Sequence, residues 1–411
     1  MHEYSKKNKI IAFIDPILFI NGMVFININT VIPYFLIRLS ASNIHISLTN
    51  FLATLGSFLP SLFVARYVQR LKVKNRAFAK LLFTQRMIFL IFILLLPFFI
   101  KYLGNIFSIY IFILFWGIFN FFVGAYGPFY FSILDKILPY EERGRVVATG
   151  NAIGNIIALL STYLLNIFLS KFSFPYNFML IFLAGIIILL ADAYLFYIID
   201  EKEEETIENS LSFTEFIKYS FSFLSKDKNF RLAVTSFVFI FLSLTSISYF
   251  IVYTVRTFKV DSNVVSAFTF LSILANIVGG LSFGELSRRI GYKKVLILGT
   301  FLGAFGLFIV TLIRHLYAPF IGYTFVMLNF NANMTIGGFL LSALAKRENI
   351  PIYMAINNTI SISLSSLMHI LNGLIINFLG FQFLFGICLS FILIALVLLI
   401  RVKEYKRENS Y

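Results

Sequence analysis

The fold is decided by residues 269–294, which read TFLSILANIVGGLSFGELSRRIGYKK, a long apolar run that ends in basic residues. Residues 50–75, which read NFLATLGSFLPSLFVARYVQRLKVKN, align with this stretch without a gap, so that Lys74 matches Lys293. A helix that crosses the roughly 30 Å hydrocarbon core of a bilayer needs about 20 apolar residues. Both copies reach that length. The sequence therefore predicts a membrane helix that recurs in the chain.

Twelve apolar runs of this kind fill almost the whole chain. We predict spans at residues 11–37, 47–68, 78–100, 106–134, 146–169, 177–199, 230–256, 264–287, 294–314, 316–342, 352–376 and 380–400. Helices satisfy their own backbone hydrogen bonds, so lipid can surround them. The sequence predicts an all-α integral membrane protein of twelve transmembrane helices, in two six-helix parallel repeats.

Two other pairs of spans support this repeat. Asn151, Asn155 and Asn166 of span five match Asn357, Ser361 and Asn372 of span eleven at a constant shift. Asn120 and Gly124 of span four match Asn329 and Asn333 of span ten. Both halves start on the same side of the membrane, so the repeat axis runs along the membrane normal. We expect an N-terminal bundle at residues 1–199, a linker at 200–229 and a C-terminal bundle at 230–411.

The linker begins with an acidic run from Asp200 to Glu208 and continues with apolar residues spaced among polar ones. This pattern predicts a short amphipathic helix on the cytoplasmic surface. A disordered tether is the alternative.

Composition and charge exclude several classes of protein. The chain has 411 residues, of which 59% are hydrophobic and 13% are charged, and its net charge is +15. Lys and Arg concentrate at the two ends, in the central linker and in the loops on the same side, which is the positive-inside bias. We expect a multi-pass protein of the cell membrane with both termini in the cytoplasm. The basic charge then reflects topology and contact with anionic lipid, not nucleic-acid binding.

The loop after span eight, Gly284–Lys294, carries a resemblance to a known family. It reads GELSRRIGYKK and resembles the signature of the major facilitator superfamily, Gly-x-Leu-x-Asp-Arg-x-Gly-Arg-Lys. Arg288 stands where the family has an acid, and Gln69 stands there in the first copy. The resemblance implies an alternating-access transporter whose loop acid braces the start of span eleven, or of span five in the matching half. Glu285 is the candidate substitute for that acid.

The resemblance also implies functional positions. The conformational-gate loop is expected at Arg70, Lys74, Glu285, Arg289, Gly291 and Lys293. The loop Leu138–Arg145 after span four is also similar to the family's form. The glycine-proline motif of antiporters is absent from span five, which disfavours a proton antiporter.

In this fold, spans one, two, four and five and their counterparts in the second half surround a central cavity. Polar stripes on these spans must face protein or water, because polar side chains in lipid are costly. The cavity candidates are Asn21, Asn29, Trp116, Asn120, Asn151, Asn155, Ser246, Tyr249, Tyr253, Asn329, Asn333, Asn358, Ser361, Ser365 and His369. The alternative is that they form hydrogen bonds between helices. An amide and aromatic lining favours a neutral polar solute such as a sugar, although apolar drugs also use aromatic walls.

Asp15, Arg86 and Asp192 are charged residues inside predicted spans. Buried charges are expected to pair. One hypothesis is a structural ion cluster in the N-terminal half. The other is a proton site at Asp15, which would couple transport to a proton or cation.

The sequence thus predicts a secondary active or facilitative transporter of a small organic solute, with efflux of drugs or other hydrophobic compounds as the alternative. A polytopic enzyme acting on lipid-linked substrates and a non-transporting sensor are the hypotheses from other classes. The glycines Gly299, Gly303 and Gly306 lie inside an apolar run and do not form a nucleotide loop. We expect no cofactor, no metal and no catalytic residues.

Overall fold

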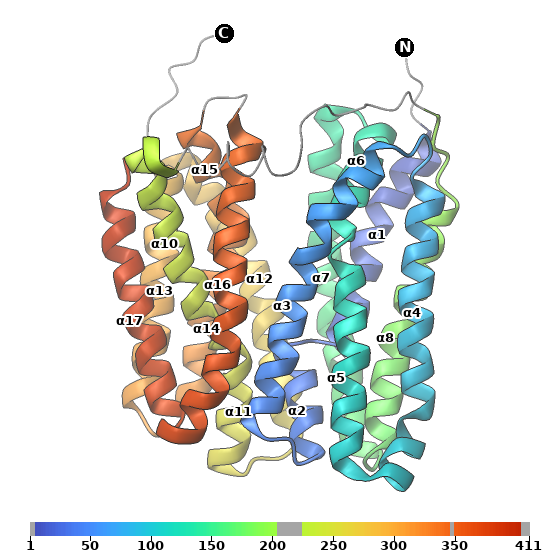
Figure 1. Cartoon of the computed structure of the whole chain (residues 1–411), viewed down its shortest axis with the longest axis vertical. Helices are drawn as coiled ribbons and strands as arrows, with labels where there is room; N and C mark the ends of the chain where they lie inside the picture. The colour runs from blue at the N-terminus through green and yellow to red at the C-terminus, as the bar shows by residue number, and fades with distance from the viewer. Residues whose placement is uncertain (1–4, 204–223, 346–348, 404–411) are drawn as a thin grey trace. The chain divides into compact units, whose positions relative to one another are not determined.

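The computed structural model describes residues 5–203, 224–345 and 349–403. The regular secondary structure of these residues consists of helices joined by short turns and loops, and it contains no strand (Figure 1). The first half contains α1 (Lys6–Phe25), α2 (Val31–Arg38), α3 (Asn43–Gln69), α4 (Asn75–Phe98), η1 (Phe99–Leu103), α5 (Gly104–Val123), α6 (Tyr126–Ile137), α7 (Tyr140–Lys171) and α8 (Tyr176–Tyr197). The second contains α10 (Lys228–Leu244), α11 (Ile247–Phe258), α12 (Asn263–Ile290), α13 (Tyr292–Leu312), α14 (Tyr317–Ala332), η2 (Asn333–Gly337), α15 (Gly338–Leu344), α16 (Ile350–Leu379) and α17 (Phe381–Arg401).

The described helices fit a membrane protein. Nine helical stretches among the described residues are long and apolar enough to cross a bilayer, and one of them, Asn75–Ile137, contains two predicted spans. The predicted all-α membrane fold is confirmed, whereas the number of twelve spans stays a prediction.

Contacts between helices divide the chain into two compact units. The first unit comprises Met1–Asn209 and Val260–Ile273, and the second comprises Ser210–Lys259 and Leu274–Tyr411. The start of α12 therefore belongs to the first unit, where the hydroxyl groups of Thr30 and Thr269 are 2.7 Å apart. The bundle boundaries at 199 and 230 stay predictions. Most of the expected linker helix, residues 204–223, lies outside the described residues.

Every third predicted span is interrupted in the structure, beginning with the first. The first span breaks at residues 26–30, the fourth at 124–125 and the seventh at 245–246. The tenth contains the π-helical turn η2. Polar side chains bond to nearby backbone at two of these breaks, which competes with the regular helix. Asn27 Oδ1 accepts from Asn29 N at 2.8 Å, and Thr245 Oγ1 donates to Leu242 O at 2.7 Å.

Glycines allow two pairs of helices to pack backbone against backbone. A Cβ atom on Gly124 would lie 2.5 Å from Gly56 O, and one on Gly306 would lie 2.5 Å from Gly322 O. Small residues at such crossings let membrane helices approach closely. The contacts join α3 to α5 in the first unit and α13 to α14 in the second.

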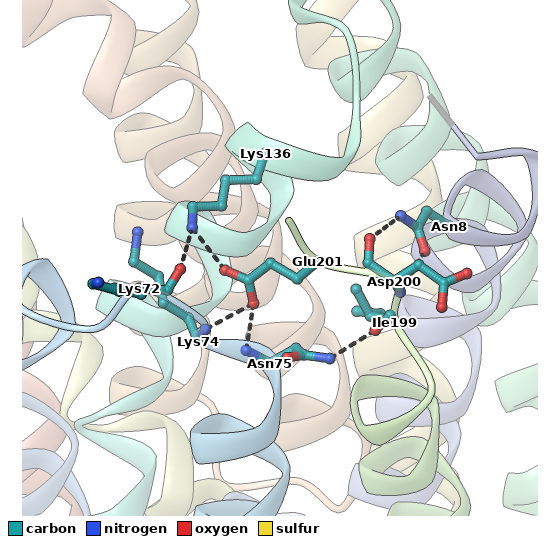
Figure 2. A network of polar contacts seen from close by, with 8 residues as sticks. All are labelled: Asn8, Lys72, Lys74, Asn75, Lys136, Ile199, Asp200 and Glu201. Atoms are coloured by element: carbon teal, nitrogen blue, oxygen red, sulfur yellow. Dashed lines mark hydrogen bonds and ion pairs between the residues drawn. The ribbon is translucent and has the colours of Figure 1, made fainter. Parts of the chain in front are cut away.

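Each unit has a clamp between the start of its first helix and the residues after its last helix. Asn8 Nδ2 donates to Asp200 O at 2.9 Å, and Asp200 N donates to Asn8 Oδ1 at 3.1 Å. Asn229 and Lys403 exchange the same two bonds at 2.7 and 2.8 Å. Figure 2 shows the clamp of the first unit. The repeat therefore extends to single side chains at the helix ends.

We expect the clamps to stabilise their units. Asn8→Ala removes two hydrogen bonds from a site that is 4% exposed, so the free energy of unfolding should fall by about 1–3 kcal/mol. Asn229→Ala should cost less, because its site is more exposed. The measurement is chemical unfolding in detergent, with the exposed Asn105→Ala as control. Equal stabilities for Asn8→Ala and Asn105→Ala would contradict the clamp.

Candidate functional site

The three charged side chains of the predicted spans lie together in the first unit. Arg86 of α4 is 0% exposed, Asp192 of α8 is 2% exposed and Asp15 of α1 is 6% exposed. Arg86 Nη2 donates to Asp192 Oδ2 at 2.7 Å. A buried charge is tolerated when it is paired and hydrogen-bonded. The pairing accounts for Arg86 and Asp192, and it leaves Asp15 as a second carboxyl group beside one guanidinium.

Polar groups on α4 and α6 complete the cluster. The Asp15 carboxyl group interacts with Asp192 and with the Tyr130 hydroxyl group. Tyr126 donates from its hydroxyl to Gln85 Oε1, and Gln85 Nε2 donates to Phe119 O at 2.7 Å. Tyr126 and Tyr130 are one helical turn apart, so both face the charges. Sequence reasoning missed Gln85, Tyr126 and Tyr130, and the four-residue spacing of the two tyrosines was the available signal.

A cavity of about 390 Å³ adjoins this cluster. Asp15, Arg86 and Asp192 form part of its surface. Most of the remaining wall is aromatic: Phe19, Phe78, Tyr126, Tyr130, Phe131 and Phe196. We call this space the charge cavity. It combines ring faces, hydrogen-bond acceptors and hydrogen-bond donors in a volume suited to a small solute.

Two nitrogen atoms of the Arg86 guanidinium are available as hydrogen-bond donors beside this cavity. Its Nε and Nη1 atoms are buried and make no hydrogen bond of standard geometry within the described part of the chain, and the Tyr126 side chain is a polar group that interacts with Arg86. Buried polar groups without a partner are rare in folded proteins, because leaving them unpaired is costly. A solute or water molecule with an acceptor oxygen would satisfy them.

The other candidates of the first unit lie in three kinds of place. Asn21 bonds to α7, since its Nδ2 donates to Gly154 O at 3.1 Å and its Oδ1 accepts from Ser161 Oγ at 2.7 Å. Trp116 is 1% exposed and stacks on neighbouring rings, and Asn120 donates to Trp116 O. Three asparagines are more accessible: Asn29, Asn151 and Asn155. Of these, Asn151 lies in the wall of the charge cavity.

In the second unit, most candidates are also buried. Tyr253 OH accepts from Gln382 Nε2 at 2.9 Å, and Asn333 Nδ2 donates to Asn329 Oδ1 at 2.9 Å. The exposed fractions of Ser246, Tyr249, Ser361 and Ser365 are all at most 4%. Asn358 is exposed, and His369 is half-buried. That these residues line a central cavity stays a prediction.

The gate-loop candidates lie at helix ends. Lys74 N donates to Glu201 Oε2 at 2.8 Å, and Arg70 is the C-cap residue that follows α3. Glu285 accepts from Arg288 and from Arg289, both on its own helix, at 3.3 and 3.0 Å. Gly291 has a φ of +89° between α12 and α13, a conformation that favours glycine.

Lys293 Nζ donates to Ile400 O at 2.7 Å, which connects α13 to the end of α17. Figure 2 shows that Lys74, Asn75 and Lys136 surround Glu201 in the same region of the first unit. The first copy of the loop is thus connected to the end of α8, and the second copy to the end of α17.

Comparison with known families decides the class of this protein. The sequence model of the Major Facilitator Superfamily matches residues 15–275 and 234–410. The chain belongs to the major facilitator superfamily. The resemblance predicted from the loop at Gly284–Lys294 is confirmed, and the chain is a membrane transporter by family. No curated protein matches its sequence significantly.

Solved transporters share the fold of this superfamily member. The xylose transporter XylE from E. coli is 15% identical, with a TM-score of 0.68, and the match covers 98% of this chain and 99% of that one. The nucleoside transporter NupG is 12% identical, with a TM-score of 0.67 and coverage of 96% and 98%. The fucose:proton symporter FucP from E. coli is 12% identical, with a TM-score of 0.60 and coverage of 97% and 98%. At these identities the likeness concerns the fold alone.

Proposed function

We propose that this protein is a secondary transporter that moves a small, neutral, polar organic solute, such as a sugar, by alternating access. The two bundles would expose the solute to one side of the cytoplasmic membrane at a time. Both termini would lie in the cytoplasm, as the Lys and Arg distribution favours. The observation that carries the proposal is the buried trio of Asp15, Arg86 and Asp192 beside the charge cavity.

The chemistry of the charge cavity supports a hydroxyl-rich solute. A hydroxyl group both donates and accepts hydrogen bonds, so one solute hydroxyl can donate to Asp15 and another can accept from Arg86. The faces of Tyr126 and Phe78 can stack against an apolar ring face. Structural neighbours that carry xylose, fucose and nucleosides agree with this solute class.

The balance of charge supports coupling to a proton at Asp15. Arg86 neutralises Asp192, which leaves the Asp15 carboxyl group without a positive partner of its own. Ionisable groups within membrane spans are costly and mark proton or ion pathways. Asp15 would bind a proton in one state and release it in another.

The aromatic wall of the charge cavity also favours a second candidate, the efflux of hydrophobic compounds. A lipophilic cation would stack on the rings and pair with Asp15. Thermal unfolding of the purified protein separates the two, because a bound ligand stabilises the fold. Stabilisation by xylose, fucose or uridine supports the first proposal. Stabilisation by tetraphenylphosphonium, and by none of these, supports the second.

Asp15→Asn is expected to reduce pH-driven uptake in proteoliposomes at least about tenfold while the protein stays folded. An amide keeps the hydrogen bonds but cannot carry the proton. The assay uses the best-stabilising sugar, and exchange without a pH gradient should persist. Glu203→Gln, at an exposed acid of the same unit that borders neither the charge cavity nor its neighbours on α6 and α7, is the control. Undiminished pH-driven uptake by Asp15→Asn would exclude this coupling site.

A further inference from the structure

A second hollow lies next to the charge cavity in the same unit. Its volume is about 580 Å³, and residues of α6 and of the following helix α7 line it. Four residues border both spaces: Tyr130, Phe131, Val147 and Asn151. We call the second hollow the α6–α7 cleft. Because the two spaces have a wall in common, they adjoin at these four side chains.

The far part of the cleft is polar and lies where α6 ends and α7 begins. Asp135 and Arg143 form an ion pair there, and Arg143 also donates to Asp135 O. The side chain of Asp135 is 68% exposed. Gly144 borders the cleft, and a Cβ atom built on it would meet nothing within 4 Å. Water therefore has a polar entrance to the cleft.

Tyr130 stands where the cleft meets the buried charges. Its ring borders both spaces, and its hydroxyl group interacts with Asp15. The groups around Asp15 are Asp192 of α8, Arg86 of α4 and the two tyrosines of α6. Asn151 of α7 adds a second polar side chain to the surface that the two spaces share. A proton that leaves Asp15 thus meets a hydroxyl group first and the cleft next.

We propose that the α6–α7 cleft is the route by which water and protons reach Asp15, with Tyr130 as its inner gate. The route lies wholly within the first unit, and it deepens the proposed function because it gives the coupling acid its connection to bulk water. On the expected topology, the Asp135–Arg143 end faces the cytoplasm. Proton exchange at Asp15 then occurs with that side of the membrane.

The test uses a cysteine in place of the acid. Asp15→Cys in a Cys388→Ala background places the chain's single thiol at the inner end of the route and leaves the Arg86–Asp192 pair intact. The purified protein is treated with a small, charged, water-soluble methanethiosulfonate, and the rate of modification is followed by mass spectrometry. Asn151→Cys, on the shared wall, is a second reporter if Asp15→Cys does not fold.

Blocking the route supplies the decisive comparison. Gly144→Trp adds an indole at a residue that borders the cleft, where a Cβ atom meets nothing within 4 Å. Gly280→Trp on α12 is the matched control, since a Cβ atom there also meets nothing within 4 Å. We expect Gly144→Trp to slow modification at least about tenfold, because a filled cleft excludes the reagent, and Gly280→Trp to leave the rate unchanged. Tyr130→Ala should increase it.

Two results would overturn the route. One is a rate that Gly144→Trp leaves unchanged or that Gly280→Trp slows instead. The other is no modification of either reporter while an exposed cysteine reacts. Modification requires neither a solute nor a bound proton. Failure of the route is therefore distinguishable from failure of proton-coupled transport, which Asp15→Asn tests by uptake.

Discussion

Arg86→Leu is expected to lower the free energy of unfolding by about 3–5 kcal/mol, since removing one member of a buried ion pair leaves the other charge uncompensated. The Arg86 and Asp192 side chains are 1% and 2% exposed, so the Asp192 carboxylate would lose its ion-pair partner in a buried site. The variant should therefore melt at a markedly lower temperature in detergent. Thermal unfolding, followed by circular dichroism, measures this change.

Asp192→Asn should restore part of the stability of Arg86→Leu, because it removes the stranded charge. Asp15→Asn should restore less, since Arg86 Nη2 bonds to Asp192. Arg76→Leu, at an exposed arginine near the start of α4, is the matched control. If Arg86→Leu is as stable as Arg76→Leu, the ion pair does not hold α4 to α8.

The membrane helices could be predicted from sequence because an apolar run of about 20 residues is typical of a helix that crosses a bilayer. Their interruptions could not. At the breaks at residues 26–30 and 245–246, the side chains of Asn27 and Thr245 bond to nearby backbone. A single polar residue of this kind hardly changes the mean hydropathy of a span. The predicted spans are therefore continuous where the structure has two helices.

The charged trio could also be predicted, because charges inside apolar spans are rare and must find each other. The direction in which uncharged residues face could not. In a membrane bundle the lipid-facing and core-facing sides are both apolar, so hydrophobic periodicity does not distinguish them. Trp116 is 1% exposed, while Phe131 is 70% exposed and Tyr163 is 66% exposed. Asn21 shows the second of the two roles that the sequence leaves open for a polar residue in a span, since it bonds to α7.

The clamps correspond to a short repeat in the sequence that is too weak to predict them. Lys7–Asn8 recurs as Lys228–Asn229, and each asparagine bonds to the backbone just after the last helix of its unit. Two-residue matches are common by chance in a chain rich in lysine and asparagine. The match between Lys7–Asn8 and Lys228–Asn229 is significant because both asparagines make the same pair of backbone hydrogen bonds.

Glu201→Ala is expected to lower the free energy of unfolding by roughly 3 kcal/mol, because charge-assisted hydrogen bonds and a buried ion pair are lost together. Glu201 Oε2 accepts from Lys74 N at 2.8 Å and from Asn75 N at 2.6 Å, where the first turn of α4 begins. Glu201 Oε1 pairs with Lys136 Nζ at 2.9 Å, and the two side chains are 0% and 7% exposed (Figure 2). A carboxylate at a helix N-terminus is favourable.

Glu201→Gln should cost less, because its amide oxygen can still accept from both backbone N–H groups, whereas it cannot pair with Lys136. Glu203→Ala, two residues further on and exposed, should cost almost nothing. Hydrogen exchange gives a local readout, since the amides of Lys74 and Asn75 are the donors and should exchange faster in Glu201→Ala. Unchanged exchange at these amides, or equal stabilities of Glu201→Ala and Glu203→Ala, would show that Glu201 does not hold the end of α8 to α4 and α6. Faster exchange of the Lys74 and Asn75 amides in Glu201→Ala would show that one buried carboxylate fixes the beginning of the linker to the first unit.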